Sequence, residues 1–153
     1  MIDDFVTAKA LLDKAQAFAD ALIVPDPFDS SATVVGARLC IQGAAFTPVT
    51  TETYLKETFL SNDTDPLGLA ADSSDRQDSI YQLDIYTPKD NGKFSGLAIS
   101  NEIKAEFPRA SFIYESAEQK VQVSNVSAAM LPANKTHNMV SLSIDLVVLA
   151  CNS

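Results

Sequence analysis

The side chains that most often carry chemistry in proteins are few in this sequence. Its 153 residues contain one histidine, His137, and two cysteines, Cys40 and Cys151, which are far apart in the chain. His137 has no second histidine or cysteine at metal-ligand spacing, so we expect a solvated loop side chain, not a catalytic base or a zinc ligand. Because the cysteines do not form a CxxC pair, we expect small, buried apolar groups in a reducing compartment rather than a disulfide.

The sequence also lacks the short motifs that bind phosphates or activate a nucleophile. It contains no GxSxG elbow, no GxGxxG and no complete phosphate-binding loop. Asn91-Gly92-Lys93 has the Gly-Lys pair of such a loop, but the upstream glycine is missing, and a polar turn is the better interpretation. Glu102 and Glu106 lie one helical turn apart and are interpreted as an exposed helix face. The sequence therefore predicts a protein that is not an enzyme, with no cofactor and no metal.

An acidic stretch, residues 61–79, has no clear hydrophobic period. Its charged side chains are Asp63, Asp65, Asp72, Asp75, Arg76 and Asp78. Asp63 and Asp65 are spaced like the start of a calcium-binding loop, but Ser74 stands where a bidentate glutamate is needed. Loops of this length are unusual inside a compact domain and are often functional. We interpret the stretch as a loop that is either solvated or docks on a partner.

The overall charge restricts the classes of partner. The formal net charge is −9, and no stripe of Lys and Arg is present. A protein that grips nucleic acid through its phosphates needs such a stripe, whereas an acidic surface suits DNA that must slide past without sticking. The N-terminus is acidic where a signal peptide is positive, and the longest apolar run, residues 146–151, is too short to span a bilayer. We therefore expect a protein made in a cytosol.

The hydrophobic pattern predicts two helices and several strands. Helical spacing of apolar residues predicts helices over residues 3–22 and 97–107, the second ending at Pro108. Alternation predicts half-buried strands over residues 80–86 and 140–148. Further strands are predicted over residues 34–41, 54–60, 111–115 and 120–126, and a loop over residues 128–138. The pattern predicts a single domain, residues 1–153, with an α+β fold in which a mixed, mainly antiparallel sheet packs against two main helices.

In this order of elements the sequence resembles the tail terminator proteins of long-tailed bacteriophages and prophages, the group of lambda minor tail protein U. The resemblance rests on patterns of residue type and order and covers nearly the whole chain. It is carried by the long N-terminal helix, Phe46-Thr47-Pro48, the strand of residues 54–60, Tyr81 to Pro88, Asn91-Gly92-Lys93, the helix ending at Phe107-Pro108, and the strand of residues 140–148.

The resemblance implies a ring, typically a hexamer, in the tail of the virion. Such a ring stops polymerisation of the major tail tube protein at the head-proximal end and offers a surface to the head completion or connector protein. DNA would pass through the lumen without specific binding, no membrane would be involved, and assembly would take place in the cytoplasm of the bacterial host. Two alternatives stay open: another head–tail connector or adaptor ring, or a small accessory domain that binds a ligand or peptide on the sheet face under the helices.

A closed ring needs two different contact patches on every copy. We predict that one patch lies in the acidic stretch and the other in the polar turn of residues 89–93. The predicted interface residues are Asp63, Asp65, Asp72, Asp75, Arg76, Asp78, Lys89 and Lys93. For both segments an ordinary solvated loop is the alternative.

Overall fold

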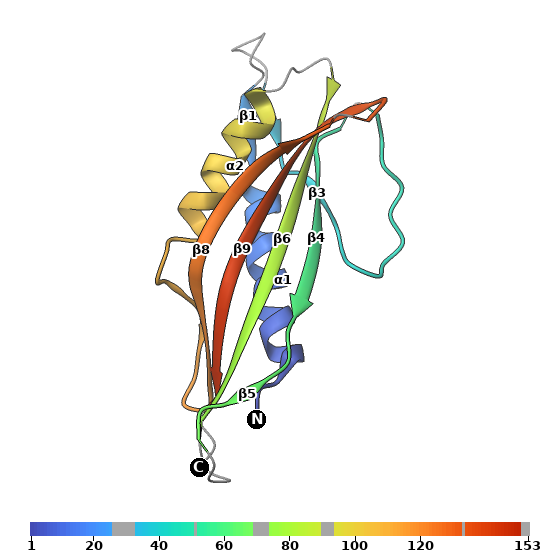
Figure 1. Ribbon diagram of the computed structural model, residues 1–153. Helices are drawn as coiled ribbons and strands as arrows, with labels where there is room; N and C mark the ends of the chain where they lie inside the picture. The colour runs from blue at the N-terminus through green and yellow to red at the C-terminus, as the bar shows by residue number, and fades with distance from the viewer. Residues whose placement is uncertain (26–32, 51, 69–73, 90–93, 133, 151–153) are drawn as a thin grey trace.

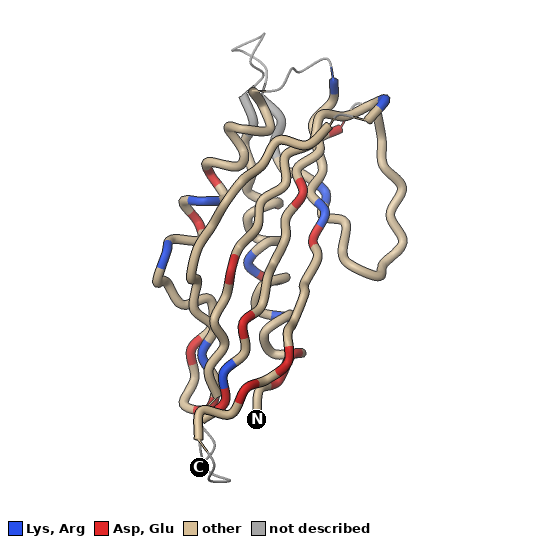
Figure 2. The backbone as a smooth tube through the Cα atoms, in the orientation of Figure 1, with Lys and Arg blue, Asp and Glu red and all other residues tan. Residues whose placement is uncertain are grey.

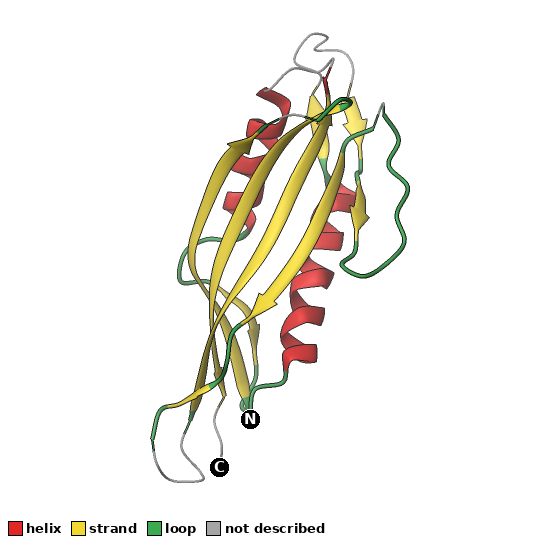
Figure 3. Ribbon diagram, turned by 45° about the vertical axis from the view of Figure 1, so that its right-hand side comes forward, coloured by secondary structure: helices red, strands yellow, loops and turns green. Residues whose placement is uncertain are grey.

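The structure is a computed structural model that describes residues 1–25, 33–50, 52–68, 74–89, 94–132 and 134–150. In this part of the chain, helices α1 (Asp4–Ala21) and α2 (Phe94–Glu106) lie on the same face of a curled sheet (Figure 1). The opposite face is left without a described helix (Figure 3). The predicted α+β fold is therefore confirmed. Neither described helix is long and apolar enough to cross a membrane.

The sheet is mainly antiparallel, and the described residues contribute seven strands to it. Their bounds are β3 (Arg38–Cys40), β4 (Tyr54–Ser61), β5 (Asp65–Pro66), β6 (Asp75–Pro88), β7 (Phe112–Glu115), β8 (Gln119–Leu131) and β9 (His137–Ala150). They are ordered β3-β4-β6-β9-β8-β7, and β5 pairs with the start of β6. Only β3 with β4 is a parallel pair among these. The strands β1 (Ile23–Pro25) and β2 (Thr33–Val35) pair separately as a small ribbon.

The core lies between the two helices and the central strands. The alternation in β6 and β9 directs one side chain in two toward the helices, and these residues are fully or almost fully buried: Tyr81, Leu83, Ile85, Val140, Leu142, Ile144 and Leu146. Leu11 and Ala15 of α1 and Ile99 of α2 meet them. Each fully buried large apolar side chain contributes roughly 1.5–3 kcal/mol of transfer free energy. The predicted half-buried strands over residues 80–86 and 140–148 are confirmed.

Two local features fix the helices on the sheet. A Cβ atom on Gly96 would lie 2.9 Å from Val140 Cγ2, so only glycine lets α2 approach β9 this closely. At the start of α1, the Asp3 carboxylate caps the helix by accepting from the backbone N–H of Phe5 at 3.0 Å. The buried Gln119 of β8 holds the same turn, because its Oε1 accepts from the N–H of Asp3 at 2.8 Å.

The long strands extend beyond their predicted ends. β6 begins at Asp75, and β8 runs on to Leu131, so the predicted loops over residues 61–79 and 128–138 are wrong in these parts. Each extension is held by continuous backbone pairing with β9, which overrides the polar character of the residues. The predicted strand over residues 34–41 is interrupted at Gly36, whose φ of 79° falls in the left-handed region.

Candidate assembly surfaces

The predicted interface residues that the structure describes lie near the two ends of β6, a central strand as long as β9. Asp75, Arg76 and Asp78 open β6, while Lys89 follows directly after its last residue. A strand of 14 residues spans roughly 45 Å at about 3.3 Å per residue. The structure thus separates the two predicted patches instead of bringing them together. Asp72 and Lys93 lie outside the described residues.

At the β5 end of the molecule, acidic residues lie around the start of β6 (Figure 2). Asp63 and Asp65 are exposed, and Asp65 pairs through its backbone with Arg76. The Arg76 guanidinium lies 3.1 Å from the carboxylate of Asp78, and the N-terminal ammonium lies 3.6 Å from that of Asp75. Exposed pairs of this kind contribute little to stability. Their carboxylates give this end an acidic surface.

At the other end of β6 the described charges include two exposed lysines. Lys89 follows β6, and its backbone N–H donates to the Thr136 carbonyl oxygen at 3.1 Å. Lys135 lies on the connection between β8 and β9. The two ends of the molecule therefore differ in charge, as Figure 2 shows.

His137 lies in an aromatic cluster with Tyr54 and Tyr86, next to the backbone of Glu52. Its ring is 2 % exposed and makes edge contacts with Tyr54 at 5.2 Å and Tyr86 at 6.3 Å between centroids. Its Nε2 donates to the Glu52 carbonyl oxygen at 3.0 Å, and Nδ1 lies 2.9 Å from Thr136 Oγ1. The expected solvated loop histidine is wrong, because β9 begins at His137 and pairs with Pro88.

An ion pair also holds the described part of the segment that follows β3, residues 41–50 and 52–53. The Arg38 guanidinium bonds the Glu52 carboxylate, donates to the Thr47 carbonyl oxygen at 2.6 Å, and lies 4.4 Å from the ring centroid of Phe46. The hydrogen bond from Arg38 lowers the pKa of Glu52. Burial raises the pKa of Tyr54, so its hydroxyl stays protonated. The ion pair and the His137 hydrogen bond together clamp this part of the chain to β3 and β9.

One outer edge of the sheet is a short stretch of β4, Glu57–Ser61, which we name the β4 edge. β3 pairs with β4 only over Tyr54–Lys56, so no described strand covers the β4 edge. Instead the Gln42 side chain occupies it: Oε1 of Gln42 accepts from the backbone N–H of Phe59 at 2.7 Å. The backbone N–H of Gln42 in turn donates to the Glu57 carboxylate at 3.0 Å.

A groove of about 410 Å³ runs between the β4 edge and α1. Its lining residues are Phe5, Ala8, Lys9, Leu12, Asp13, Gln42, Glu57 and Phe59. Most of this lining is apolar, and the Phe5 side chain is 73 % exposed. An exposed apolar groove beside an uncovered strand edge is typical of a surface that receives a partner.

The opposite outer edge is the far half of β8, Ser124–Leu131, which we name the β8 edge. β7 pairs with β8 only as far as Gln122. The next residue, Val123, donates its N–H to the Ser111 carbonyl oxygen at 2.8 Å and accepts from the Ala110 N–H at 2.8 Å. Beyond Val123, no described strand covers this edge. Met130 is 52 % exposed, so apolar surface accompanies the free backbone groups here as well.

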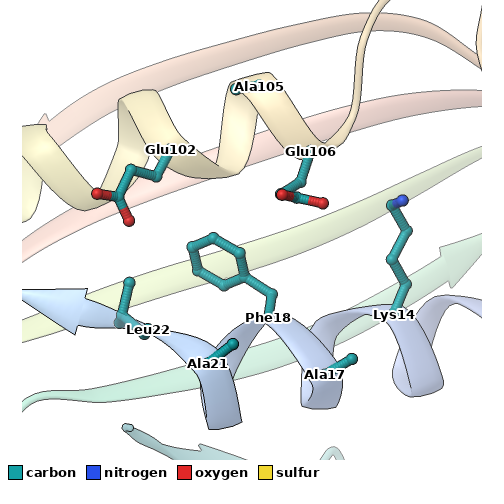
Figure 4. Close-up of a pocket in the computed structure, with 8 residues that line it drawn as sticks. All are labelled: Lys14, Ala17, Phe18, Ala21, Leu22, Glu102, Ala105 and Glu106. Carbon is teal, nitrogen blue, oxygen red and sulfur yellow. The ribbon is translucent and has the colours of Figure 1, made fainter. Parts of the chain in front are cut away.

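A second groove of about 540 Å³ lies between α1 and α2 (Figure 4). Phe18 fills its middle, and Glu102 and Glu106 reach over it from α2. Lys14 stands at one end, with Nζ 5.3 Å from the ring centroid of Phe107. The predicted exposed face of Glu102 and Glu106 is confirmed. Across the described residues, no group of three His, Cys, Asp or Glu side chains is placed to hold a metal ion.

Sequence reasoning missed both outer edges, because an edge depends on where the neighbouring strand stops. The sequence pattern predicts the strand β4, but it does not predict that β3 ends early. Gly43 gave the only local signal, since its φ of 81° makes the turn that follows β3. Cys40, at the end of β3, is half-buried and free, whereas Cys151 lies outside the described residues.

Comparison with known proteins gives a family match. A family model described as phage tail terminator protein matches residues 14–146. No curated protein matches. Ten chains of solved structures match, and one of them superposes with a TM-score of 0.71 and 17 % sequence identity over 97 % of this chain and 96 % of that chain. At this identity the likeness shows a shared fold.

Proposed function

We propose that this chain, which belongs to the phage tail terminator family, forms a closed ring that ends the tail tube at its head-proximal side. The family is structural, and its members belong to the phage tail. In the proposed role a hexameric ring covers the polymerising surface of the last tube ring and presents a different surface to the head completion or connector protein. The ring assembles in the cytoplasm of the bacterial host and becomes part of the virion.

The observation that carries the ring is the pair of unlike sheet edges. A cyclic assembly uses heterologous contacts, so one patch of each copy meets a different patch of the next. Uncovered strand edges join readily, because each offers backbone N–H and C=O groups that need partners. β4 and β8 run in opposite directions, since β6 and β9 between them alternate. The β8 edge of one copy would therefore extend the next copy's sheet at β4 as an antiparallel strand.

The two edges also lie at the same height of the sheet. Glu57 aligns across β6 and β9 with Ala128, through the register pairs with Leu83 and Leu142. Paired residues share a face, so Ala128 points to the helix side, as Glu57 does. Its neighbour Val126 on that face lies level with Phe59 and would then pack in the groove beside α1. Both the backbone and the apolar surfaces of the edges are thus complementary.

The two ends of the molecule suit two different axial partners. The acidic end around β5 and the end that carries Lys89 and Lys135 offer unlike surfaces for the tube and the head. The net charge of −9 supports a lumen through which DNA passes without specific binding. Purified protein should therefore show no retention on duplex DNA at moderate salt, and micromolar retention would contradict this part of the proposal.

Two neighbouring alanines provide the test. In Ala128→Glu a carboxylate on the helix side would meet Glu57 of the next copy and the apolar groove, whereas in Ala129→Glu the carboxylate lies on the open face, level with Lys56. Both sites are exposed in the free chain, so both variants should fold. At a protein concentration at which the wild type assembles, the mass by light scattering should be about six times the 16.4 kDa chain for Ala129→Glu and close to one chain for Ala128→Glu.

The same pair is tested for tail function by complementation. Tails made with Ala128→Glu should lose uniform length and fail to join heads, while tails made with Ala129→Glu should match the wild type. Equal behaviour of the two variants in both assays would show that the β8 edge does not form the ring contact.

A further inference from the structure

The two edges differ in one respect that a simple docking surface does not require. The β8 edge is free of side-chain hydrogen bonds from the described residues, whereas the β4 edge is occupied by Gln42. We propose that the Gln42 side chain is a removable plug, which keeps the β4 edge closed in the free chain and is displaced by the β8 edge of a second copy. This inference rests on the proposed ring.

The geometry of the plug matches that of an added strand. The N–H of Phe59 points away from β6, because it donates to Gln42 on the outer side at 2.7 Å. This N–H is a donor that an incoming antiparallel strand would use. The amide oxygen of Gln42 therefore holds the place of a backbone carbonyl oxygen from the next copy. One acceptor can replace the other without leaving the N–H unpaired.

The plug is mounted on a turn that can release it. β3 ends at Cys40, and the turn closes through the N–H of Ala44 to the Ile41 carbonyl oxygen at 3.0 Å. Gly43 has a φ of 81°, and a Cβ there would meet nothing within 4 Å, so the turn has open space around it. The backbone of Gln42 is tethered by Glu57, which is 6 % exposed. The side chain can thus rotate away while the turn stays in place.

A closed edge and an open edge on the same chain control when copies join. Two open edges would invite pairing at any concentration, which natural sheet proteins avoid. A plug that forms one neutral hydrogen bond shifts the association constant by about fivefold. Self-association of the free chain then needs about fivefold more protein than it would without the plug, and copies held close together on the last ring of a tube would exceed that concentration.

Sedimentation of Gln42→Ala over a concentration series tests the plug. The variant should self-associate at a concentration about fivefold lower than the wild type. The matched control is Gln16→Ala, which removes a half-buried glutamine whose Nε2 donates to Asp20 on α1, and it should associate like the wild type. A Gln42→Ala protein that associates equally or less well overturns the plug.

Amide hydrogen exchange over residues 57–61 adds a local measurement. In dilute Gln42→Ala this segment should exchange faster than in the wild type, and in assembled protein the two should be equally protected. Protection that still depends on Gln42 in the assembly would overturn displacement.

If Ala128→Glu blocks assembly but Gln42→Ala does not promote it, the plug alone fails. If Ala128→Glu and Ala129→Glu assemble alike, the edge contact of the proposed ring fails.

Discussion

The β4 edge and the β8 edge are the two places where the sheet of this protein ends, and they are built differently. At β4 the neighbouring strand is three residues long, a side chain takes over its hydrogen bonding, and an apolar groove lies alongside. At β8 the strand runs on past its neighbour with its outer backbone uncovered. Two plugged edges would favour a monomer, and two bare edges would favour uncontrolled pairing. A chain with one plugged edge and one bare edge can join other copies in one direction only.

The largest expected effect separates the two faces of the β8 edge. Ala128→Glu should weaken association at least about a hundredfold, or roughly 3 kcal/mol, because like charges brought together at an interface cost several kcal/mol. Ala128→Lys should be tolerated far better, since its ammonium would meet Glu57 instead. Light scattering of the two variants measures the difference. If the lysine blocks assembly as strongly as the glutamate, the two edges do not meet at this height.

The next effect concerns the plugged side alone. His137→Ala should lower the free energy of unfolding by about 2 kcal/mol, because it removes a buried ring and its bond to the Glu52 carbonyl oxygen. Since this bond fixes the segment that follows Gln42, hydrogen exchange should increase at residues 52–61 and not at residues 124–131. Thermal unfolding and exchange measure the two parts. Equal loosening of both edges would contradict their independence.

Phe5 tests the groove beside the β4 edge. Its side chain is 73 % exposed, so Phe5→Ser should leave the stability of the free chain within about 0.5 kcal/mol. In the assembled ring of subunits the phenyl group of Phe5 would be covered. Phe5→Ser should therefore lower the association constant roughly tenfold. Phe112→Ser is the matched control, because Phe112 is also exposed, at 47 %, but lies on β7. Sedimentation of both variants decides whether apolar burial accompanies strand pairing.

The sequence predicts the frame of this molecule better than its edges. The helices and the alternation of β6 and β9 follow from apolar spacing, because burial on one face imposes that period. The strand ends do not follow from it. Gln77 and Ser79 are polar yet only 3 % and 2 % exposed, since Ser79 donates to Gln77 at 3.0 Å and Gln77 donates to Asp4 at 3.1 Å. Such pairing over long sequence distance is invisible to a local pattern.

The candidate surfaces were harder to predict for the same reason. Charged segments without a hydrophobic period predict loops, and the described parts of these segments lie at the two ends of the molecule. The edges consist of ordinary strand residues, and what makes them available is the early end of β3 and of β7. His137 shows the reverse case. Its polar sequence neighbours predict an exposed side chain, whereas strand pairing buries it against Tyr54 and Tyr86.

The smallest expected effect is a pH dependence confined to the plugged side. Because the bond from Arg38 lowers the pKa of Glu52 below its ordinary value of 4.5, the charged form is favoured by folding. The stabilisation is therefore present above pH 4.5 and is lost as the pH falls through the lower, folded value. Arg38→Ala should remove this dependence, whereas Lys120→Ala, which breaks an exposed pair with Glu115 between β7 and the start of β8, should retain it. Thermal unfolding of both variants between pH 7 and pH 3 measures the contrast.

A clamp that matters to the β4 edge should also show faster amide exchange at residues 57–61 in acid, with residues 124–131 unchanged. Acid loosening of both edges together would mean that the clamp supports the whole sheet and not one side of it.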